Sequence, residues 1–515
     1  MLVDPAATHG DPPNPKIHAH EIAVAVRNSL RLGGSLLITW SVALIVKLQV
    51  PAHLGPVRQG HFGFAESFAA IFLSTIGLGV ETYIIKEVSV RPKHASDFVG
   101  GVFALRLAMS VVFCAAMALT LRATGRSTEI QLTALVFGAT QFLINMNATL
   151  AAVLQAATHV GRLAVANIAA KIVWGAGLLV GLHYGMALYI LALPMLASEL
   201  LRTAVLVPTA NLAAQLRFRI DVKALWTVLV ISFPFFVNAM AVSFGNNFGV
   251  SALEFIRTDE REVGWFAATM NVGTLAMLLH PLIAWVVMPM LSRAHARSAD
   301  EFLFILRRSI EGLIVIIAPV TTILSTGAAV FLKTAFGEKY LPATTGLSIV
   351  SLMFVMTYMN IILASALIIQ GKSWTVTFTS VGSIVVMAAF MLAFVPAGRL
   401  IVGVGGECAG AAVAVIASEA CVVFAMLRST RYAALDGRNI AVLIKSVAVS
   451  ACVILIDRLL RPIGPVRLIV DAALYVALAL AIRVVRPSDV RRTVLTLRAQ
   501  RAAAEIVEAG DRGRM

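Results

Sequence analysis

Long apolar stretches recur along almost the whole chain, with short polar segments between them. Each stretch has roughly the 20 residues that a helix needs to cross a bilayer. Because backbone groups in lipid must be satisfied within their own segment, we expect helices and no strands. The pattern predicts an all-α polytopic membrane protein with about fourteen transmembrane helices, near residues 33–52, 62–84, 98–120, 130–152, 163–182, 187–207, 225–252, 264–290, 310–332, 344–369, 374–395, 403–426, 439–456 and 466–485.

Composition agrees with this pattern. The 515 residues are 59% hydrophobic and 13% charged, whereas about 25% of the residues in a soluble domain are charged. The net charge of +15 is typical of some nucleic-acid-binding proteins, but here the basic residues stand between apolar runs and are not interleaved with aromatic residues. We therefore expect the lipid bilayer as a partner and no nucleic acid.

The four cysteines are Cys114, Cys408, Cys421 and Cys452, and all lie inside apolar runs. Their spacing fits no zinc or iron–sulfur pattern, and small buried hydrophobic residues explain them. No metal site and no cofactor are predicted.

Lys and Arg are distributed unevenly over the connecting segments. One side of the predicted membrane topology carries more than twice as many of them as the other. This bias places both termini in the cytoplasm, in agreement with an even number of spans. The outer loops have about ten residues or fewer, so no extracytoplasmic domain is expected.

An internal repeat at an offset of 204 residues relates Gly60 to Gly264, Phe62 to Phe266 and Lys93 to Arg297. Six spans separate the copies, so both halves point the same way, as in parallel-repeat transporters. The repeat predicts a first six-helix bundle at 33–208, a cytoplasmic linker at 209–224 and a second six-helix bundle at 225–428. Outside them lie a cytoplasmic N-tail (1–32), two extra transmembrane helices (439–485) and a basic cytoplasmic tail (486–515), which is either a surface helix or a frayed tail.

Three stretches carry a family signature. The first is LGPVRQGHFGFAESFAAIFLSTIGLGVETYIIKEVS at 54–89, with a Leu-Gly-Pro turn, a glycine-flanked aromatic residue and a Gly-Leu-Gly segment. The second is Ala318-Pro319 followed by FGEKYLPA at 336–343, and the third is VGWFAA at 263–268, with Phe266 where a tyrosine is usual. Together they resemble the flippases for lipid-linked oligosaccharides, in the multidrug/oligosaccharidyl-lipid/polysaccharide exporter superfamily.

The resemblance covers about residues 33–428. It implies two six-helix bundles around a central cavity, alternating access, and a polyprenyl-diphosphate oligosaccharide as cargo for surface polysaccharide biosynthesis. It also implies the bacterial inner (cytoplasmic) membrane as location, and other membrane proteins of polysaccharide assembly as partners. A diphosphate with sugars cannot cross hydrocarbon unaided, so the cavity should present cations to it.

Three of the basic residues inside predicted spans are candidates for the substrate site. Arg106 and Lys171 each lie nine residues into an apolar run, about 13 Å deep at 1.5 Å per residue. Embedded cations of this kind face a cavity or pair with a carboxylate. Both residues are therefore candidates for the substrate site, and pairing with Glu81 or Glu199 is the structural alternative. Lys47 is nearer the outer surface and is the third cationic candidate.

Four further polar residues lie inside spans. Glu66 is the candidate ion-coupling group, because an embedded carboxylate without a partner favours its protonated form; a salt bridge with Lys47 is the alternative. Asn246 and Asn247 are candidates for binding sugar hydroxyls, or they hydrogen-bond between helices. His280 precedes Pro281 and either contacts the cargo or a proton, or bonds a carbonyl that the proline frees.

Basic residues also gather where the second and eighth spans reach the cytoplasm. They predict an inner-mouth site that attracts an anionic head group, although anionic lipid and the topology bias explain them as well. The candidates are Lys86, Arg91, Lys93, Arg293 and Arg297.

Three other functions compete with a flippase. A drug or cation antiporter of the same superfamily predicts an acidic cavity with few cations. A membrane polysaccharide polymerase or ligase needs reactive groups on a sizeable outer loop, and the sequence has no such loop and no catalytic constellation. A scaffold that transports nothing does not account for the embedded cations. We therefore predict no enzymatic activity and no catalytic residues.

Overall fold

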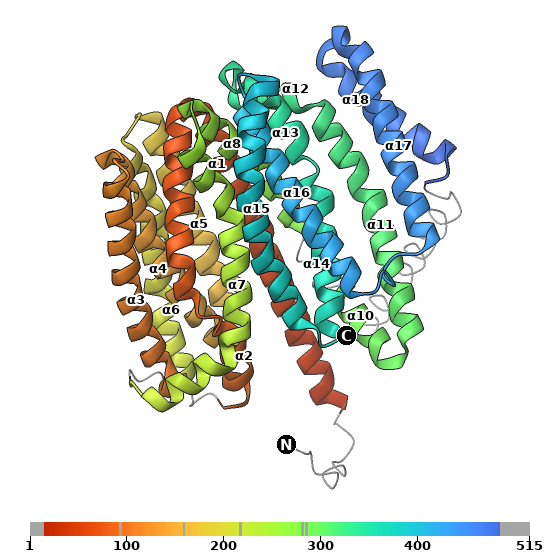
Figure 1. Cartoon of the computed structure of the whole chain (residues 1–515). Helices are drawn as coiled ribbons and strands as arrows, with labels where there is room; N and C mark the ends of the chain where they lie inside the picture. The colour runs from red at the N-terminus through yellow and green to blue at the C-terminus, as the bar shows by residue number, and fades with distance from the viewer. Residues whose placement is uncertain are drawn as a thin grey trace, which may run out of the picture. The chain divides into compact units, whose positions relative to one another are not determined.

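The computed structural model describes residues 15–91, 95–157, 160–215, 219–279, 283 and 287–484. Throughout these ranges the secondary structure is helical and contains no strand (Figure 1). The predicted all-α polytopic membrane fold is confirmed. The predicted basic tail at 486–515 and the first residues of the N-tail lie outside the described ranges.

Nine helical segments of this part of the chain are long and apolar enough to cross a membrane, or eleven if two bent pairs are each one span. Two of them, Gly34–Gly77 and Gly437–Ala481, have 44 and 45 residues, about twice the length of one crossing. Each contains a residue with a left-handed backbone, Gly55 and Gly464 respectively. Each therefore has room for the two spans that the sequence predicted there; the total of fourteen stays a prediction.

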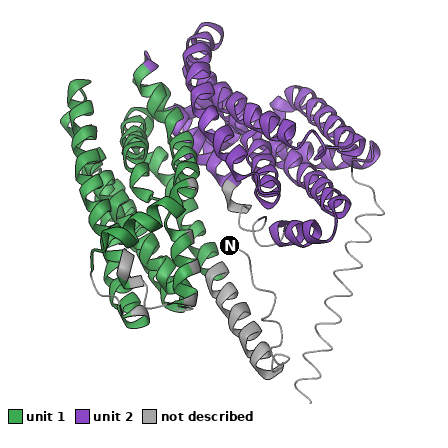
Figure 2. Ribbon diagram, turned by 60° about the horizontal axis from the view of Figure 1, so that its bottom comes forward, with its two compact units in different colours: residues 1–255, 259–264 green, residues 256–258, 265–515 purple. Residues whose placement is uncertain are grey.

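The chain divides into two compact units (Figure 2). Unit 1 comprises residues 1–255 and 259–264, and unit 2 comprises 256–258 and 265–515. The helix at 222–256, which the sequence assigned to the second bundle, is thus grouped with the helices before it. That the two six-helix bundles of the repeat meet at 209–224 stays a prediction.

In unit 1 most of the helix packing joins helices that are not consecutive in the sequence. The long helix α1 contacts α4 and α5, and α6 packs on α4 and α5. Helix α7 bends by 60° between its parts 222–233 and 235–256. The elements are α1 (Pro15–Leu73), η1 (Ser74–Gly77), α2 (Glu81–Val90), α3 (Ala95–Ala123), α4 (Thr128–Ala156), α5 (Val160–His183), α6 (Leu188–Ala214) and α7 (Val222–Ile256).

Helix α8 (Glu260–Gly273) leads from unit 1 into unit 2. In unit 2, α16 packs on α13, α14 and α15, while α11 packs on α10, α14 and α17. The elements are η3 (Thr274–Leu279), α10 (Met288–Arg297), α11 (Ala299–Thr326), α12 (Ala328–Phe336), η5 (Glu338–Ala343), α13 (Thr344–Val350), α14 (Met353–Ile369), α15 (Ser373–Val402), α16 (Gly406–Ser429), α17 (Gly437–Leu460), η6 (Arg461–Val466) and α18 (Arg467–Ala481).

Polar contacts attach the last two helices to α11. Asn439 Nδ2 donates to the Arg307 carbonyl (2.9 Å), and Thr322 Oγ1 donates to Ser450 Oγ (2.8 Å). Toward the other end of α11, Arg467 donates to the Thr326 carbonyl (3.1 Å) and forms an ion pair with Asp457 (3.0 Å). Helices α17 and α18 are therefore an integral part of unit 2.

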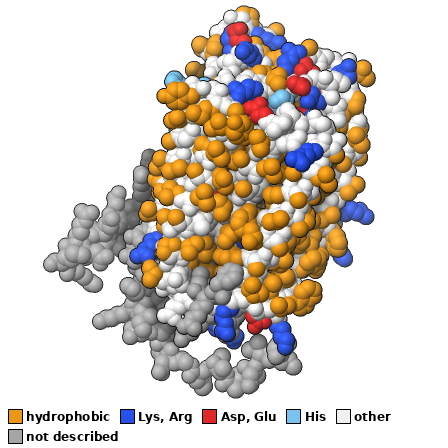
Figure 3. Space-filling model, turned by 90° about the vertical axis from the view of Figure 1, so that its left-hand side faces the viewer, with side chains coloured by type: hydrophobic (Ala, Val, Ile, Leu, Met, Phe, Trp, Pro, Cys, Tyr) orange, Lys and Arg blue, Asp and Glu red, His pale blue; other side chains and the backbone are white. Residues whose placement is uncertain are grey.

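The outer surface of the helices is apolar. Figure 3 shows a broad band of hydrophobic side chains on one face of the molecule, with charged side chains gathered above and below it. On α3 the band includes the exposed residues Leu107, Val111, Val112 and Leu119. A soluble protein rarely exposes an apolar patch of this extent, whereas lipid tails cover it in a membrane.

Candidate functional site

The second predicted span is broken inside the membrane. The sequence predicted one helix over 62–84, but α1 ends at Leu73 and the 3₁₀ turn η1 follows. Leu78 and Gly79 then have positive φ angles of 57° and 62° before α2 begins at Glu81. Such a break frees backbone carbonyls, and in hydrocarbon these need donors from elsewhere in the protein.

Arg106 of α3 supplies those donors. Its Nε donates to the Ile76 carbonyl (2.9 Å), and its Nη2 donates to the Gly77 carbonyl and to Glu81 Oε1 (2.8 Å). Its Nη1 donates to two groups of α4, the Asn145 carbonyl and Thr149 Oγ1. The side chain is 0% exposed. Of the two readings of the sequence, pairing with Glu81 is present in the structure, and a cargo role for Arg106 stays a prediction.

Charged residues of α1 and α6 act electrostatically on Lys171 of α5. Lys47 and Glu66 on α1, Lys171 on α5 and Glu199 on α6 form an electrostatic cluster in which Lys171 interacts with the other three. The Lys171 ammonium lies over the Trp174 ring, 3.7 Å from its centroid, a cation–π contact that helps to hold it. Lys171 is half-buried and Glu66 is exposed, so these side chains are not enclosed in the packed interior of unit 1. We call these four residues the Lys171 cluster.

Contacts of Glu199 anchor one end of the Lys171 cluster. Asn147 of α4 donates its Nδ2 to Glu199 Oε2 (2.8 Å) and to the Glu199 carbonyl (3.0 Å). Arg202 donates to the same Oε2 (3.4 Å), and Thr203 donates to Asn147 Oδ1 (2.9 Å). The salt bridge between Lys47 and Glu66, which was the alternative for these residues, is absent from the described contacts, and both residues interact electrostatically with Lys171. The sequence analysis did not single out Asn147 or Arg202.

The amide candidates on α7 are not grouped with that cluster. Asn247 donates to the carbonyl of Ser243 in its own helix (2.8 Å), which occupies its amide without joining two helices. Asn246 is exposed. His280 lies outside the described residues.

The candidates for the inner mouth are only partly described. Arg91, at the end of α2, pairs with Glu87 (3.6 Å) and remains largely exposed. In unit 2, Arg293 is exposed on α10, and Arg297 pairs with Glu301 (2.8 Å). Lys86 lies on α2 and its side chain is not described, and Lys93 lies outside the described residues. All three arginines are exposed at the surface, where anionic groups can reach them.

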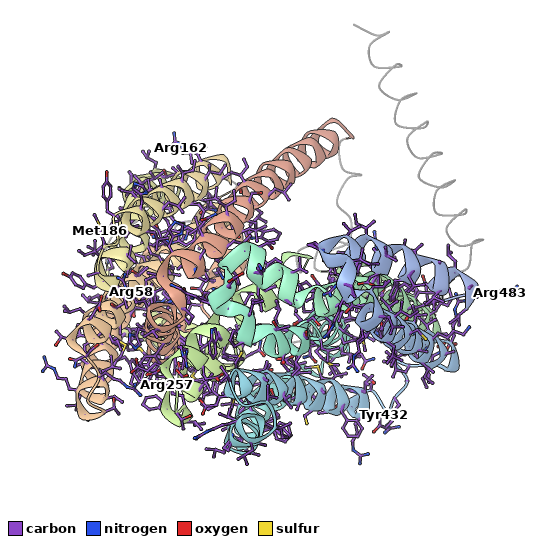
Figure 4. The ribbon with its side chains drawn as sticks, turned by 90° about the horizontal axis from the view of Figure 1, so that it is seen from above. Arg58, Arg162, Met186, Arg257, Tyr432 and Arg483 are labelled. Atoms are coloured by element: carbon purple, nitrogen blue, oxygen red, sulfur yellow. The ribbon has the colours of Figure 1, made fainter. Side chains whose placement is uncertain are left out.

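Arg58 of α1 lies beside Met186 (Figure 4), and its Nη2 donates to the Met186 carbonyl (2.7 Å). This contact joins the connection within α1 to the connection between α5 and α6. At this end it holds α1, which carries Lys47 and Glu66, next to α5, which carries Lys171.

One embedded carboxylate was missed by the sequence analysis. Glu419 lies within the predicted span 403–426, on α16, and accepts a hydrogen bond from Asn360 Nδ2 of α14. The signal that could have found it was an acidic residue within the otherwise uncharged stretch 408–427.

Comparison with known proteins agrees with the fold. Residues 54–345 match the model of a family described as "Polysaccharide biosynthesis protein". No curated protein sequence matches. Among solved structures, the lipid II flippase MurJ in an inward closed conformation is similar, with a TM-score of 0.64, 12% identity, and coverage of 88% of this chain and 98% of MurJ.

Two other transporters have the same fold. An inward-facing multidrug resistance MATE family transporter of the MOP superfamily gives a TM-score of 0.61 at 14% identity, covering 78% of this chain and 98% of that one. A mutant of the Vibrio cholerae MATE transporter VcmN gives 0.53 at 15% identity, covering 80% and 98%. Since the family model matches more than half of the 515 residues, the chain belongs to the polysaccharide biosynthesis protein family.

Proposed function

We propose that the protein is a flippase that moves a polyprenyl-diphosphate-linked oligosaccharide from the cytoplasmic to the outer leaflet by alternating access. The family supports a role in polysaccharide biosynthesis, and the fold is shared with a lipid II flippase. We place the protein in the bacterial inner membrane with both termini in the cytoplasm, and expect other membrane proteins of polysaccharide assembly as its partners.

The observation that carries this proposal is the Lys171 cluster. Lys171 lies within a predicted span and interacts electrostatically with a second cation, Lys47, and with the carboxylates of Glu66 and Glu199. A diphosphate that enters this site exchanges its hydration shell for charge-assisted hydrogen bonds. Glu66 and Glu199 balance the two cations while the site is empty, which reduces the cost of keeping charges in hydrocarbon.

The cations favour this function over a drug or cation antiporter, whose cationic cargo they would repel. A membrane polymerase or ligase is disfavoured for a different reason. Four of the connections predicted to face outside, at 124–127, 184–187, 257–259 and 403–405, have three or four residues each. Such turns are too short to carry a catalytic constellation.

Deleting the gene and analysing lipid-linked intermediates tests the function directly. We expect undecorated cells in which the glycolipid accumulates on the cytoplasmic leaflet, because synthesis continues while translocation stops. Drug sensitivity with normal surface polysaccharide would instead establish the antiporter. Normal translocation of the glycolipid in the deletion strain would exclude the flippase.

Replacing Lys171 by methionine should reduce glycolipid translocation while the protein stays folded. A hydrogen bond to a charged group contributes about 1.5–3 kcal/mol, so we expect a loss of about tenfold or more. Methionine retains much of the apolar stem that packs on Trp174. The measurement is the rate at which fluorescent glycolipid becomes accessible in proteoliposomes.

Lys445→Met is the matched control, because Lys445 is another half-buried lysine of a predicted span, located on α17 of unit 2, whereas the Lys171 cluster belongs to unit 1. It should translocate at the wild-type rate. A Lys171→Met protein as fast as the control would remove Lys171 from the cargo site.

A further inference from the structure

Glu419 lies deep within its helix. It follows Glu407 by twelve residues and precedes Arg428 by nine, which is about 18 Å and 13 Å along α16 at 1.5 Å per residue. Neither terminal charge is therefore within reach of its carboxylate. The described partner of Glu419 is Asn360, whose Nδ2 donates to Glu419 Oε2. Asn360 Oδ1 is buried and has no hydrogen-bond partner among the described residues.

The surroundings of this pair are apolar. Buried Leu363, three residues after Asn360 on α14, and Val422 and Met426, three and seven residues after Glu419 on α16, belong to one hydrophobic cluster of unit 2. The helices packed on α16 contribute few charged or titratable groups, and Glu419 contacts none of them in the described part of unit 2. On the neighbouring helices these groups are Tyr358 of α14 and Arg399 of α15, and α13 has none. On α16 itself they are Glu407, Cys408, Cys421 and Arg428.

Three other carboxylates within or near the predicted spans have cations. Glu81 pairs with Arg106, and Glu199 pairs with Arg202. Glu311 pairs with Arg308 and Arg438 through its two oxygens. Glu419 differs, since its described partner is a neutral amide. An ionised carboxylate in such a place costs several kcal/mol, and this cost disappears when the group is neutral.

We propose that Glu419 and Asn360 form a proton-exchange site that couples translocation to the proton gradient; this rests on the proposed flippase function. In the neutral state the carboxylate holds one proton taken from water, and its O–H becomes a donor. Asn360 Oδ1 is the acceptor available beside it, while Asn360 Nδ2 continues to donate to Glu419. When the site opens to water on the other side, the proton leaves and the carboxylate is hydrated.

Proteoliposomes that contain the full chain test the coupling, with glycolipid translocation measured with and without an imposed pH gradient at clamped membrane potential. One pH unit corresponds to a factor of about ten in the equilibrium constant per proton. With a gradient of one pH unit, the accumulation of glycolipid in the outer leaflet by the wild type should therefore rise by up to about tenfold. With Glu419→Gln the ratio of driven to undriven translocation should fall to one, and Glu419→Asp should restore part of it.

Variants at two other carboxylates serve as comparisons in this experiment. Glu338→Gln, at an exposed residue of η5 that pairs with Lys333, should keep the wild-type ratio. Glu66→Gln tests the other coupling candidate. If Glu66→Gln abolishes the gradient effect and Glu419→Gln does not, our assignment is wrong and the proton site belongs to the Lys171 cluster.

An infrared measurement separates this proposal from the flippase function, because it needs no glycolipid. The purified wild-type chain should show a C=O band of a protonated carboxyl group that disappears in Glu419→Gln and persists in Glu66→Gln. If no glycolipid is translocated but this band behaves as expected, the flippase function fails and the proton site stands. A band unchanged in Glu419→Gln would overturn the proton site whatever the cargo is.

Discussion

Replacing Gly264 by alanine is expected to prevent unit 1 from packing correctly. A Cβ atom at this position would lie 1.7 Å from the Pro56 carbonyl oxygen and 2.6 Å from its carbon. These are backbone atoms, so no side-chain rotation relieves the clash. Overpacking costs about 1–3 kcal/mol and occasionally more, and a clash with backbone belongs at the upper end. We expect the unfolding midpoint of the detergent-solubilised protein to fall by at least about 5 °C.

Gly382→Ala is the matched control for this experiment. Gly382 lies within α15, and a Cβ atom there would meet nothing within 4 Å. Alanine is the better helix former, so this variant should be at least as stable as the wild type. Thermal unfolding of both variants, followed by gel filtration after heating, gives the comparison. A Gly264→Ala protein as stable as Gly382→Ala would mean that the close approach to Pro56 is absent from the protein in a membrane.

This contact also illustrates what the sequence could and could not predict. The repeat at an offset of 204 matched Gly60 with Gly264 as equivalent positions. In unit 1 the two glycines are neighbours, since a Cβ atom on Gly60 would lie 2.9 Å from the Gly264 backbone nitrogen. A repeat shows which residues correspond, but it contains no information about which of them touch. Hydropathy was sufficient for the helices, because lipid imposes length and apolar character directly on the sequence.

The candidate site was predictable to a similar extent. Embedded charges are few, so Lys171, Lys47 and Glu66 could be identified individually, and Glu199 could be named as a partner. That they form one cluster depends on how α1, α5 and α6 pack, which periodicity does not specify. The break at Ser74–Gly77 was missed because glycine is common in transmembrane helices and does not by itself end one. The role of Arg106 could not be decided from the sequence either. The carbonyls that it binds become available only through this break.

Arg106→Ala should therefore act on folding before it acts on transport. The substitution removes all five hydrogen bonds of the guanidinium and leaves Glu81 and the Ile76 and Gly77 carbonyls without this donor. Removing one partner of a buried ion pair costs about 3–5 kcal/mol. We expect little folded protein, measured as the monodisperse fraction in gel filtration of solubilised membranes. Arg106→Lys should recover part of it, because an ammonium retains the charge but has three donors in place of five.

Two comparisons make this result specific to the broken helix. Arg162→Ala, at an exposed arginine near the start of α5, should leave the folded fraction unchanged. Glu81→Gln retains the shape of the side chain while removing its charge, so its loss should be smaller than that of Arg106→Ala. Arg106→Ala could instead accumulate as fully folded protein that translocates no glycolipid. That outcome would mean that the guanidinium acts on the cargo, because the loss of a purely structural contact would lower the folded fraction.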